Sequence, residues 1–438
     1  MKKRHFIFYG WIIVASGIMS YALGYGARYS FSVIFPSLLE EFQWPRDLTA
    51  AMLSVHILVY GLVAPVAGNL VDRIGPRKTM ASGTILLSLG LALSGFGNEP
   101  WHFYLSFGIL TGAGLCLMGA VPFTTVIRNW FEKKRGLAFS LLFFGVGGAF
   151  AFYPGIAFLI DRLNWRNTFL VEAIVFVGFM LPLLIITVRY HPREKGLPVD
   201  GMLEADGNLS TTEKPLPQII DQAWAAINWT WPKAVKTLRF WLLCISTFCL
   251  WGVVQHIMVT HHIVFAMDLG YSKIYASSVL SLFGALFALG ALASLVSDWI
   301  GREPATIISA LIGISGILVL TFLEDTSRPW MLYYYAMAFG FGLGMTGPII
   351  AATVTDIFQG PRVGAVIGFV WFSFATGGCI GPWFGGWIFE FTDNYKAAFI
   401  VAMTLYATGC AAVWLAAPRK VRMVPGRVKI RQKSLSTV

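Results

Sequence analysis

Long apolar runs separated by short charged connectors fill most of this sequence. About 20 apolar residues are enough for a helix to cross the hydrocarbon core of a bilayer, and a helix satisfies its own backbone hydrogen bonds there. Hydrophobic residues make up 56% of the chain and charged residues only 13%, which excludes an ordinary soluble enzyme. The sequence therefore predicts an all-α polytopic membrane protein with twelve transmembrane helices. The predicted spans are 9–39, 48–70, 80–97, 103–127, 136–160, 165–188, 240–267, 274–297, 305–323, 330–354, 364–389 and 397–417.

The basic residues predict the orientation of these spans. An even number of spans places both termini on one side, and a cytoplasmic N-terminus leaves most of the 33 Lys and Arg residues inside, as the positive-inside rule requires. The residues left outside are Arg46, Arg162, Arg166, Lys273, Arg328 and Lys396. The tail from Arg419 to Lys433 carries seven cations and no acid, so we expect it to lie against membrane lipid. The net charge of +11 therefore indicates lipid rather than nucleic acid as a partner, and the compact loops favour a bacterial inner membrane.

One charged connector occurs twice. Asp72, Arg73 and Gly75 lie between two apolar runs, followed by more cations, and Asp298 and Gly301 repeat the Asp-x-x-Gly core 226 residues later. Other short motifs recur at nearly the same offset, including Phe131 with Arg135 and Phe358 with Arg362. The pattern predicts two pseudo-symmetric six-helix bundles, a typical arrangement in secondary transporters. We expect bundles at 1–189 and 240–417, a cytoplasmic linker at 190–239 with a short amphipathic helix near 219–227, and a basic tail at 418–438.

The connector Gly-x-x-x-Asp-Arg-x-Gly-x-Arg-Lys at 68–78 resembles the loop between helices two and three of the major facilitator superfamily. Further motifs resemble the monocarboxylate transporter and oxalate/formate antiporter group; these are Tyr9-Gly10-Trp11, the stretch from Tyr29 to Trp44, the connector from Trp130 to Ala138, and the turn from Asp161 to Arg166. The resemblance covers most of the chain. It implies the major facilitator fold, a cavity between the bundles, alternating access, and transport of small organic anions, commonly with a proton.

The same resemblance implies roles for the repeated charges. In the family such residues hold the inner side of the two halves together, so we expect a conformational gate formed by Asp72, Arg73, Arg77, Arg135, Asp298 and Arg302. The chain departs from the group at the eighth span, 274–297, which lacks the arginine that typically binds the substrate carboxylate.

Arg28 is the leading candidate for the substrate site because a charged group inside the bilayer is costly and usually functional. Helical spacing places Tyr21, Tyr25 and Arg28 on one face of the first span. A guanidinium beside tyrosine hydroxyls suits bidentate capture of a carboxylate, and the family places a cation near this position. The alternative is that Arg28 lies near the outer end of its span and extends to the headgroups. Tyr60 is a further candidate for the cavity wall.

The seventh span is the repeat partner of the first. Gln255 and His256 correspond to Arg28 and its neighbour, and Trp251, Gln255 and His262 share one helical face. Histidine titrates near physiological pH, so His256 or His262 is a candidate for proton coupling; the alternative is a hydrogen-bonded packing residue. Glu172 is an acid well inside a predicted span. It is a third proton-coupling candidate, or else a partner of a cation or a structural hydrogen-bonding group.

These observations favour a secondary active transporter that moves a small, monocarboxylate-like organic anion with a proton. An anion exchanger, or an exporter of a larger lipophilic solute, is the alternative within transport, and a membrane-embedded anion sensor is the alternative outside it. Common hydrolase, metalloprotease and phosphate-loop motifs are missing, which argues against an enzyme. We expect no cofactor and no metal site, since the five cysteines lie in apolar runs and His261 and His262 point apart on a helix. We expect a monomer.

Overall fold

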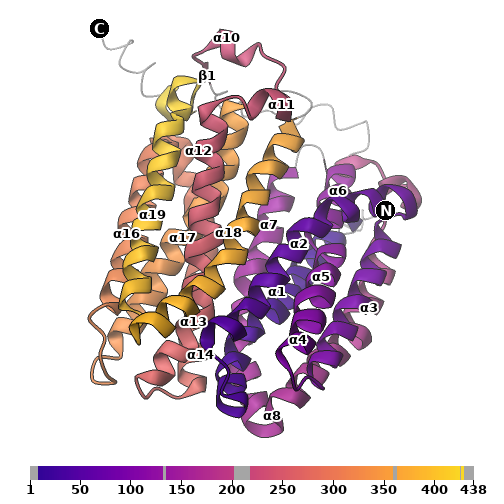
Figure 1. Cartoon of the computed structure of the whole chain (residues 1–438). Helices are drawn as coiled ribbons and strands as arrows, with labels where there is room; N and C mark the ends of the chain where they lie inside the picture. Colours follow the sequence, from indigo (N-terminus) through magenta and orange to yellow (C-terminus); the bar gives the residue numbers. More distant parts are fainter. Residues whose placement is uncertain (1–7, 132–134, 202–217, 359–362, 425, 429–438) are drawn as a thin grey trace, which may run out of the picture. The chain divides into compact units, whose positions relative to one another are not determined.

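The computed structural model describes residues 8–131, 135–201, 218–358, 363–424 and 426–428. Contacts divide the chain into two compact units, one formed by 1–44 and 48–209 and the other by 45–47 and 210–438. Nearly all described residues are helical (Figure 1). The first unit contains α1 (Tyr9–Phe42), α2 (Arg46–Ile74), α3 (Pro76–Ser94), α4 (Pro100–Phe103), η1 (Tyr104–Thr111), α5 (Gly112–Met118), α6 (Ala120–Trp130), α7 (Arg135–Gly148), η2 (Ala149–Phe152), α8 (Tyr153–Val175), η3 (Phe176–Met180), α9 (Leu181–Thr187), η4 (Pro192–Lys195) and η5 (Val199–Gly201).

The second unit has the same helical character and one small sheet. Its elements are β1 (Gln218–Ile219), α10 (Gln222–Ala225), α11 (Trp231–Ala234), α12 (Leu238–Thr247), η6 (Phe248–Val254), α13 (Gln255–Asp268), α14 (Lys273–Ala293), η7 (Ser294–Val296), α15 (Ser297–Ile300), α16 (Arg302–Leu320), α17 (Trp330–Ile357), α18 (Val363–Thr392), α19 (Lys396–Ala416), η8 (Pro418–Lys420) and β2 (Arg422–Met423). The pairs α14 with α17 and α16 with α17 form the most extensive helix contacts in the unit.

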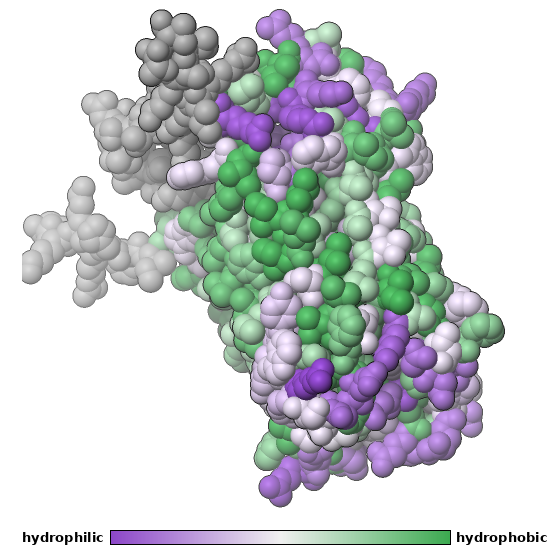
Figure 2. Space-filling view, turned by 90° about the vertical axis from the view of Figure 1, so that its left-hand side faces the viewer, coloured by the Kyte–Doolittle hydropathy of each residue, from purple (hydrophilic) through white to green (hydrophobic). Residues whose placement is uncertain are grey.

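The helices account for the predicted number of spans. Ten helical runs among the described residues are long and apolar enough to cross a membrane, and one of them, Leu141–Thr187, extends over 47 residues. That run is interrupted at Asn164, whose backbone is not helical (φ 70°, ψ 167°), so it forms two spans. The 19-residue α3 supplies the remaining one, which gives twelve. On the side where α16 and α19 lie, hydrophobic residues form a band between two hydrophilic ends (Figure 2).

The backbone repeats as the sequence does. α3 and α16 are both 19 residues long, and each follows a glycine with positive φ, Gly75 at 83° and Gly301 at 105°. A side chain is strained in that region, so glycine is favoured at both turns. α6 and α17 likewise end one residue before a phenylalanine in extended backbone, Phe131 and Phe358. The duplication predicted from the sequence is therefore also present in the local geometry of each unit.

The linker is less helical than predicted. Within 219–227 the chain forms the single helical turn α10, preceded by strand β1, and the Asp221 side chain accepts a hydrogen bond from the Trp224 amide (2.9 Å). β1 pairs antiparallel with β2 of the tail, Gln218 opposite Met423. Ile219 therefore lies in a strand, because the distant tail supplies a second strand with which it pairs. The local hydrophobic pattern of the linker cannot predict this pairing.

Glycines allow α14 and α17 to approach closely, and this gives a first prediction. A Cβ at Gly344 would collide with the carbonyl oxygen of Phe287, whereas a Cβ at Gly368 of α18 would have nothing within 4 Å. Gly344→Ala is therefore expected to lower the free energy of unfolding by about 2 kcal/mol, the cost of overpacking. Gly368→Ala, the matched control, is expected to change it by less than about 0.5 kcal/mol. Thermal unfolding in detergent measures both, and equal melting temperatures for the two variants would contradict the packing assigned to Gly344.

Candidate functional site

Arg28 lies within α1 and is buried, with 1% of the residue exposed. Its guanidinium carbon is 4.2 Å from the centre of the Tyr60 ring and 5.0 Å from that of Tyr25. The two tyrosine hydroxyls are 3.3 Å apart, which joins α1 to α2 beside the cation. Tyr29, the next residue, interacts with Arg28 electrostatically. The two rings of Tyr25 and Tyr60 and the guanidinium of Arg28 form what we call the tyrosine cage.

The cage leaves Arg28 without an anionic partner. No carboxylate among the described residues forms an ion pair with its guanidinium, and the adjacent Tyr29 side chain is a neutral neighbour. Burying an arginine without an anionic partner costs several kcal/mol. Two cation–π contacts return only part of that cost, about 0.5–2 kcal/mol each. The site therefore offers hydrogen-bond donors to a planar anion. No described side chain supplies that anion.

Tyr21 belongs to the surroundings of the cage. Its ring is 5.7 Å from that of Tyr25 and 6.3 Å from that of Phe123 in α6. Its position one helical turn before Tyr25 lets it support the Tyr25 ring rather than cover the guanidinium. Three of the residues predicted from helical spacing, with Tyr60 from α2, thus lie together in the first unit.

Glu172 of α8 also lies near this part of α1. Its Oε2 accepts a hydrogen bond from the Ser30 hydroxyl (3.2 Å), and Ser30 follows Arg28 by two residues. Tyr153, at the start of α8, interacts electrostatically with both Glu172 and Tyr29. Glu172 forms no ion pair with a described residue. Glu172 therefore lies beside the segment of α1 that carries Arg28, but it forms no ion pair with Arg28.

Trp251 and Gln255 lie in the second unit. The Trp251 indole donates a hydrogen bond to the Thr346 hydroxyl (2.9 Å), and its ring packs on Phe287 and Trp371, with ring centres 5.5 Å apart in each case. It therefore has a packing role within its own unit. Gln255 begins α13 and is 1% exposed.

The histidines of α13 are held in different ways. His256 Nδ1 is 2.8 Å from the Gly252 carbonyl oxygen, so this nitrogen carries the proton. His262 stacks on Tyr335 with ring centres 5.3 Å apart and planes inclined by 17°. His261 has partners at both nitrogens, the Pro382 carbonyl oxygen at 2.8 Å and the Tyr395 hydroxyl at 3.1 Å. His256 and His261 are thus held by hydrogen bonds, whereas His262 is held by its ring contact.

The repeated charges of the second unit form a network. Arg302 pairs with Asp298 at 2.7 Å and with Asp356 of α17 at 2.9 Å, and the Arg302 and Asp356 side chains are only 10% and 12% exposed. Our sequence analysis did not identify Asp356 as a charge partner. The available signal was its position beside Phe358, in the motif that repeats after helix ten.

The equivalent charges of the first unit are arranged differently. Asp72 and Arg73 are exposed and form no ion pair among the described residues. Arg77 donates a hydrogen bond from Nε to the Val188 carbonyl oxygen (3.2 Å), which ties the start of α3 to the end of α9. The side chain of Arg135 lies outside the described part of the chain.

Comparison with known proteins identifies the family. The sequence profile described as the Major Facilitator Superfamily matches residues 17–382 and 316–437. Monocarboxylate transporter 13 of Rattus norvegicus is 26% identical over 413 residues, covering 92% of this chain and 87% of that protein. Human monocarboxylate transporter 2 is 25% identical, covering 93% and 84%. The uncharacterised transporter YcxA of Bacillus subtilis is 23% identical, covering 94% of each chain.

A solved structure has the same fold. A bacterial homologue of the human lysosomal transporter Spinster, in an inward-facing and unoccupied conformation, matches with a TM-score of 0.67 and 16% identity. The match covers 94% of this chain and 98% of that one. At this identity the likeness concerns the fold alone. Together with the repeated connector and the twelve spans, the profile match shows that the chain belongs to the Major Facilitator Superfamily, a family of integral membrane transporters and not of enzymes.

Proposed function

We propose that this transporter carries a small organic anion of the monocarboxylate kind across the membrane together with a proton, by alternating access. The observation that carries the proposal is the tyrosine cage: a buried guanidinium, held by the rings of Tyr25 and Tyr60, that forms no ion pair with a described carboxylate. A carboxylate presents two oxygens that match the guanidinium fork. Binding would therefore satisfy the Arg28 donors and neutralise its charge in one step.

The relatives support the class of substrate. Several proteins similar over nearly the whole chain are named monocarboxylate transporters. In the family, the helix equivalent to α14 typically carries the arginine that binds the carboxylate. In this chain α14 has only one cation, Lys273, at its first position. Arg28 is therefore the intramembrane cation on which we place recognition of the anion. A site with a single guanidinium and aromatic walls fits a monoanion with an apolar substituent better than a dianion.

We further propose that both termini are cytoplasmic, because the positive-inside rule favours that orientation, and that the protein is a monomer. The repeated charges would stabilise one conformational state and release it during the transport cycle. The residues of this proposed gate are Asp72, Arg73, Arg77, Arg135, Asp298 and Arg302. Trp251 and Gln255 remain proposed contributors from the second unit, and His256 and His262 remain secondary candidates for proton coupling.

Uptake into proteoliposomes tests the proposed function. A panel of radiolabelled lactate, pyruvate, acetate, formate and oxalate is compared with and without an inward proton gradient. Gradient-stimulated uptake of one monoanion supports proton-coupled transport. Uptake that requires a second anion inside the vesicle, and ignores the gradient, would instead indicate an exchanger. If no carboxylate moves under either condition, the proposed substrate class is wrong, and larger lipophilic solutes are the next to be tested.

Glu172 is the leading candidate for the proton site, since it lies beside Ser30 in the segment that carries Arg28. Glu172→Gln keeps the shape of the side chain but removes the titratable group. We expect gradient-driven accumulation to fall by about tenfold, because a carboxyl within a span is a typical proton carrier. Exchange of substrate across the membrane without a gradient should stay within about twofold, because the Arg28 site itself is retained.

Ser30→Ala is the matched variant for this prediction. It removes the hydroxyl that donates to Glu172 but keeps the carboxyl, so accumulation driven by the gradient should persist. If Glu172→Gln accumulates substrate as the wild type does, the proton is carried elsewhere, and the same assay on His256 and His262 variants follows.

A further inference from the structure

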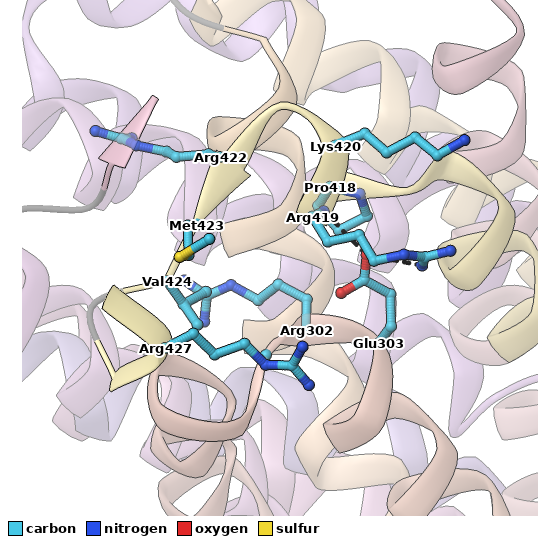
Figure 3. Close-up of a pocket in the computed structure, with 10 residues that line it drawn as sticks. Arg302, Glu303, Pro418, Arg419, Lys420, Arg422, Met423, Val424 and Arg427 are labelled. Atoms are coloured by element: carbon cyan, nitrogen blue, oxygen red, sulfur yellow. Dashed lines mark hydrogen bonds and ion pairs between the residues drawn. The ribbon is translucent and has the colours of Figure 1, made fainter. Parts of the chain in front are cut away.

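A cavity of about 310 Å³ lies in the second unit, where α15 turns into α16 and the chain leaves α19 (Figure 3). The tyrosine cage belongs to the other unit, the first. Half of its ten lining residues are cations, whereas Glu303 is the single acid among them. The lining residues are Gly301, Arg302, Glu303, Pro418, Arg419, Lys420, Arg422, Met423, Val424 and Arg427.

Two of the five cations are neutralised by acids. Arg302 pairs with Asp298 and Asp356, and Arg419 pairs with Glu303 at 3.1 Å. Glu303 is 3% exposed, and its Oε1 also accepts the Arg419 backbone amide at 3.0 Å. The other three cations are Lys420, Arg422 and Arg427, and five cations against the acids Asp298, Asp356 and Glu303 leave a net charge of +2.

Those three cations have little compensation among the described residues. Lys420 is exposed and forms no ion pair there. Arg427 donates from Nε to the Ile300 carbonyl oxygen (3.0 Å), a neutral partner. Arg422 reaches Asp356 only at 3.9 Å, and its buried Nε has no hydrogen-bond partner. In Figure 3, Lys420 and Arg422 extend to opposite sides of the tail, and Arg427 runs below it toward Arg302.

The tail that carries these cations is folded onto the unit. β2 pairs with β1, and the Ile220 amide donates to the Val421 carbonyl oxygen at 2.9 Å. A Cβ at Gly426 would collide with the backbone of Trp299, so the tail lies directly against α15. The backbone that carries the cations is therefore held in place before any ligand arrives, which reduces the ordering cost of binding.

The neighbourhood of the cavity is apolar. Pro418, Met423 and Val424 contribute to its wall. Beside it, Leu295 and Trp299 are 64% and 73% exposed, on helices η7 and α15 that end at the cavity turn. Large exposed apolar side chains on a membrane span face lipid tails. A ligand with an anionic head and an apolar body would contact both surfaces at once.

We propose that this basic surface binds the headgroups of anionic phospholipids, with Lys420 and Arg422 on opposite sides of the tail, Arg427 below it, and the acyl chains along Leu295 and Trp299. Clusters of Lys and Arg next to a membrane span attract anionic headgroups, and an arginine fork matches phosphate oxygens. A free phosphate would satisfy the cations equally well but would leave the adjoining apolar surface unused. The proposal is independent of the transported substrate and of Arg28.

Lipid titration of the full-length protein in neutral detergent tests the proposal. Short-chain phosphatidylglycerol and phosphatidylcholine with the same acyl chains are added separately, and affinity is followed by thermal stabilisation. We expect phosphatidylglycerol to bind at least about tenfold more tightly, and this preference to weaken with added salt. Arg422→Gln with Arg427→Gln should reduce the preference to within about twofold, because both removed cations attract the anionic headgroup.

The matched control removes two other exposed cations, Lys233 and Lys236, which precede α12 and do not line the cavity. Lys233→Gln with Lys236→Gln should keep the preference. If the arginine variant unfolds, Lys420→Gln is the second test variant, because Lys420 lies at the rim and forms no ion pair among the described residues. We expect Lys420→Gln to weaken the preference for phosphatidylglycerol by about threefold to fivefold. Equal binding of both lipids by the wild type, or an unchanged preference in the arginine or Lys420 variant, would overturn the proposal. Inorganic phosphate that stabilises the protein as much as the lipid does would overturn the lipid assignment.

Discussion

Arg28→Gln is expected to lower carboxylate uptake by about 100-fold, which corresponds to about 2.7 kcal/mol of lost substrate binding. The reason is that the buried guanidinium offers several donors to an anion in surroundings where no described carboxylate pairs with it. Glutamine keeps part of the length and polarity but has no charge. The measurement is initial uptake in proteoliposomes as a function of substrate concentration. Arg328→Gln, in an exposed loop between α16 and α17, is the matched control and should transport as the wild type does.

The melting temperature of Arg28→Gln distinguishes a binding role of Arg28 from a structural role. A buried charge without an anionic partner destabilises the folded protein, so Arg28→Gln should leave the melting temperature unchanged or raise it. A structural ion pair would give the opposite result, because its loss leaves a partner charge unpaired. A variant that is less stable and still transports normally would therefore contradict the proposed substrate site.

Conservative changes around Arg28 refine the test. Arg28→Lys keeps the charge but loses the planar fork, so uptake should fall by about tenfold rather than 100-fold. Tyr60→Phe keeps the ring that covers the guanidinium and should stay within about threefold of the wild type. Tyr60→Leu removes the ring and should lower uptake further, by about fivefold. If Arg28→Lys lowers uptake, the planar shape of the guanidinium matters for recognition. If Arg28→Lys transports as the wild type does, the positive charge alone is sufficient.

Asp356→Asn is expected to lower the free energy of unfolding by about 3 kcal/mol, because it removes one acid from a buried ion pair and leaves Arg302 partly compensated. Both side chains are about nine-tenths buried. Asp298, which is 44% exposed, would remain as the second partner of Arg302, so the loss lies at the lower end of the usual range. Thermal unfolding in detergent should show a fall of about 3 °C.

An exposed ion pair of the same unit provides the control. Lys396 and Glu324 are 3.0 Å apart, but their side chains are 52% and 74% exposed. Glu324→Gln should therefore change the free energy of unfolding by less than about 1 kcal/mol. Comparable losses in the two variants, or no loss in Asp356→Asn, would show that the Arg302 network does not stabilise the second unit.

The amino-acid sequence determined the features that depend on local pattern. Lengths of apolar runs predicted twelve spans, because a bilayer of fixed thickness requires a minimum helix length. The repeated connector predicted a duplicated backbone, and the glycines at 75 and 301 adopt equivalent turns because positive φ selects that residue. Arg28 was identified from sequence for a similar reason: a charge within an apolar run is conspicuous without any knowledge of its neighbours.

Only the tertiary structure decided which side chains meet. Helical spacing placed Tyr25 beside Arg28, but the contact with Tyr60 depends on how α1 and α2 rotate and cross. The same applies to Asp356 with Arg302, and to β1 with the tail strand more than 200 residues away. A helical period specifies which face of each helix is buried and leaves its rotation, depth and partner open. Rotation, depth and partner are fixed only when all helices pack together. The same packing decides whether a buried cation contacts an acid, as Arg302 does, or two aromatic rings, as Arg28 does.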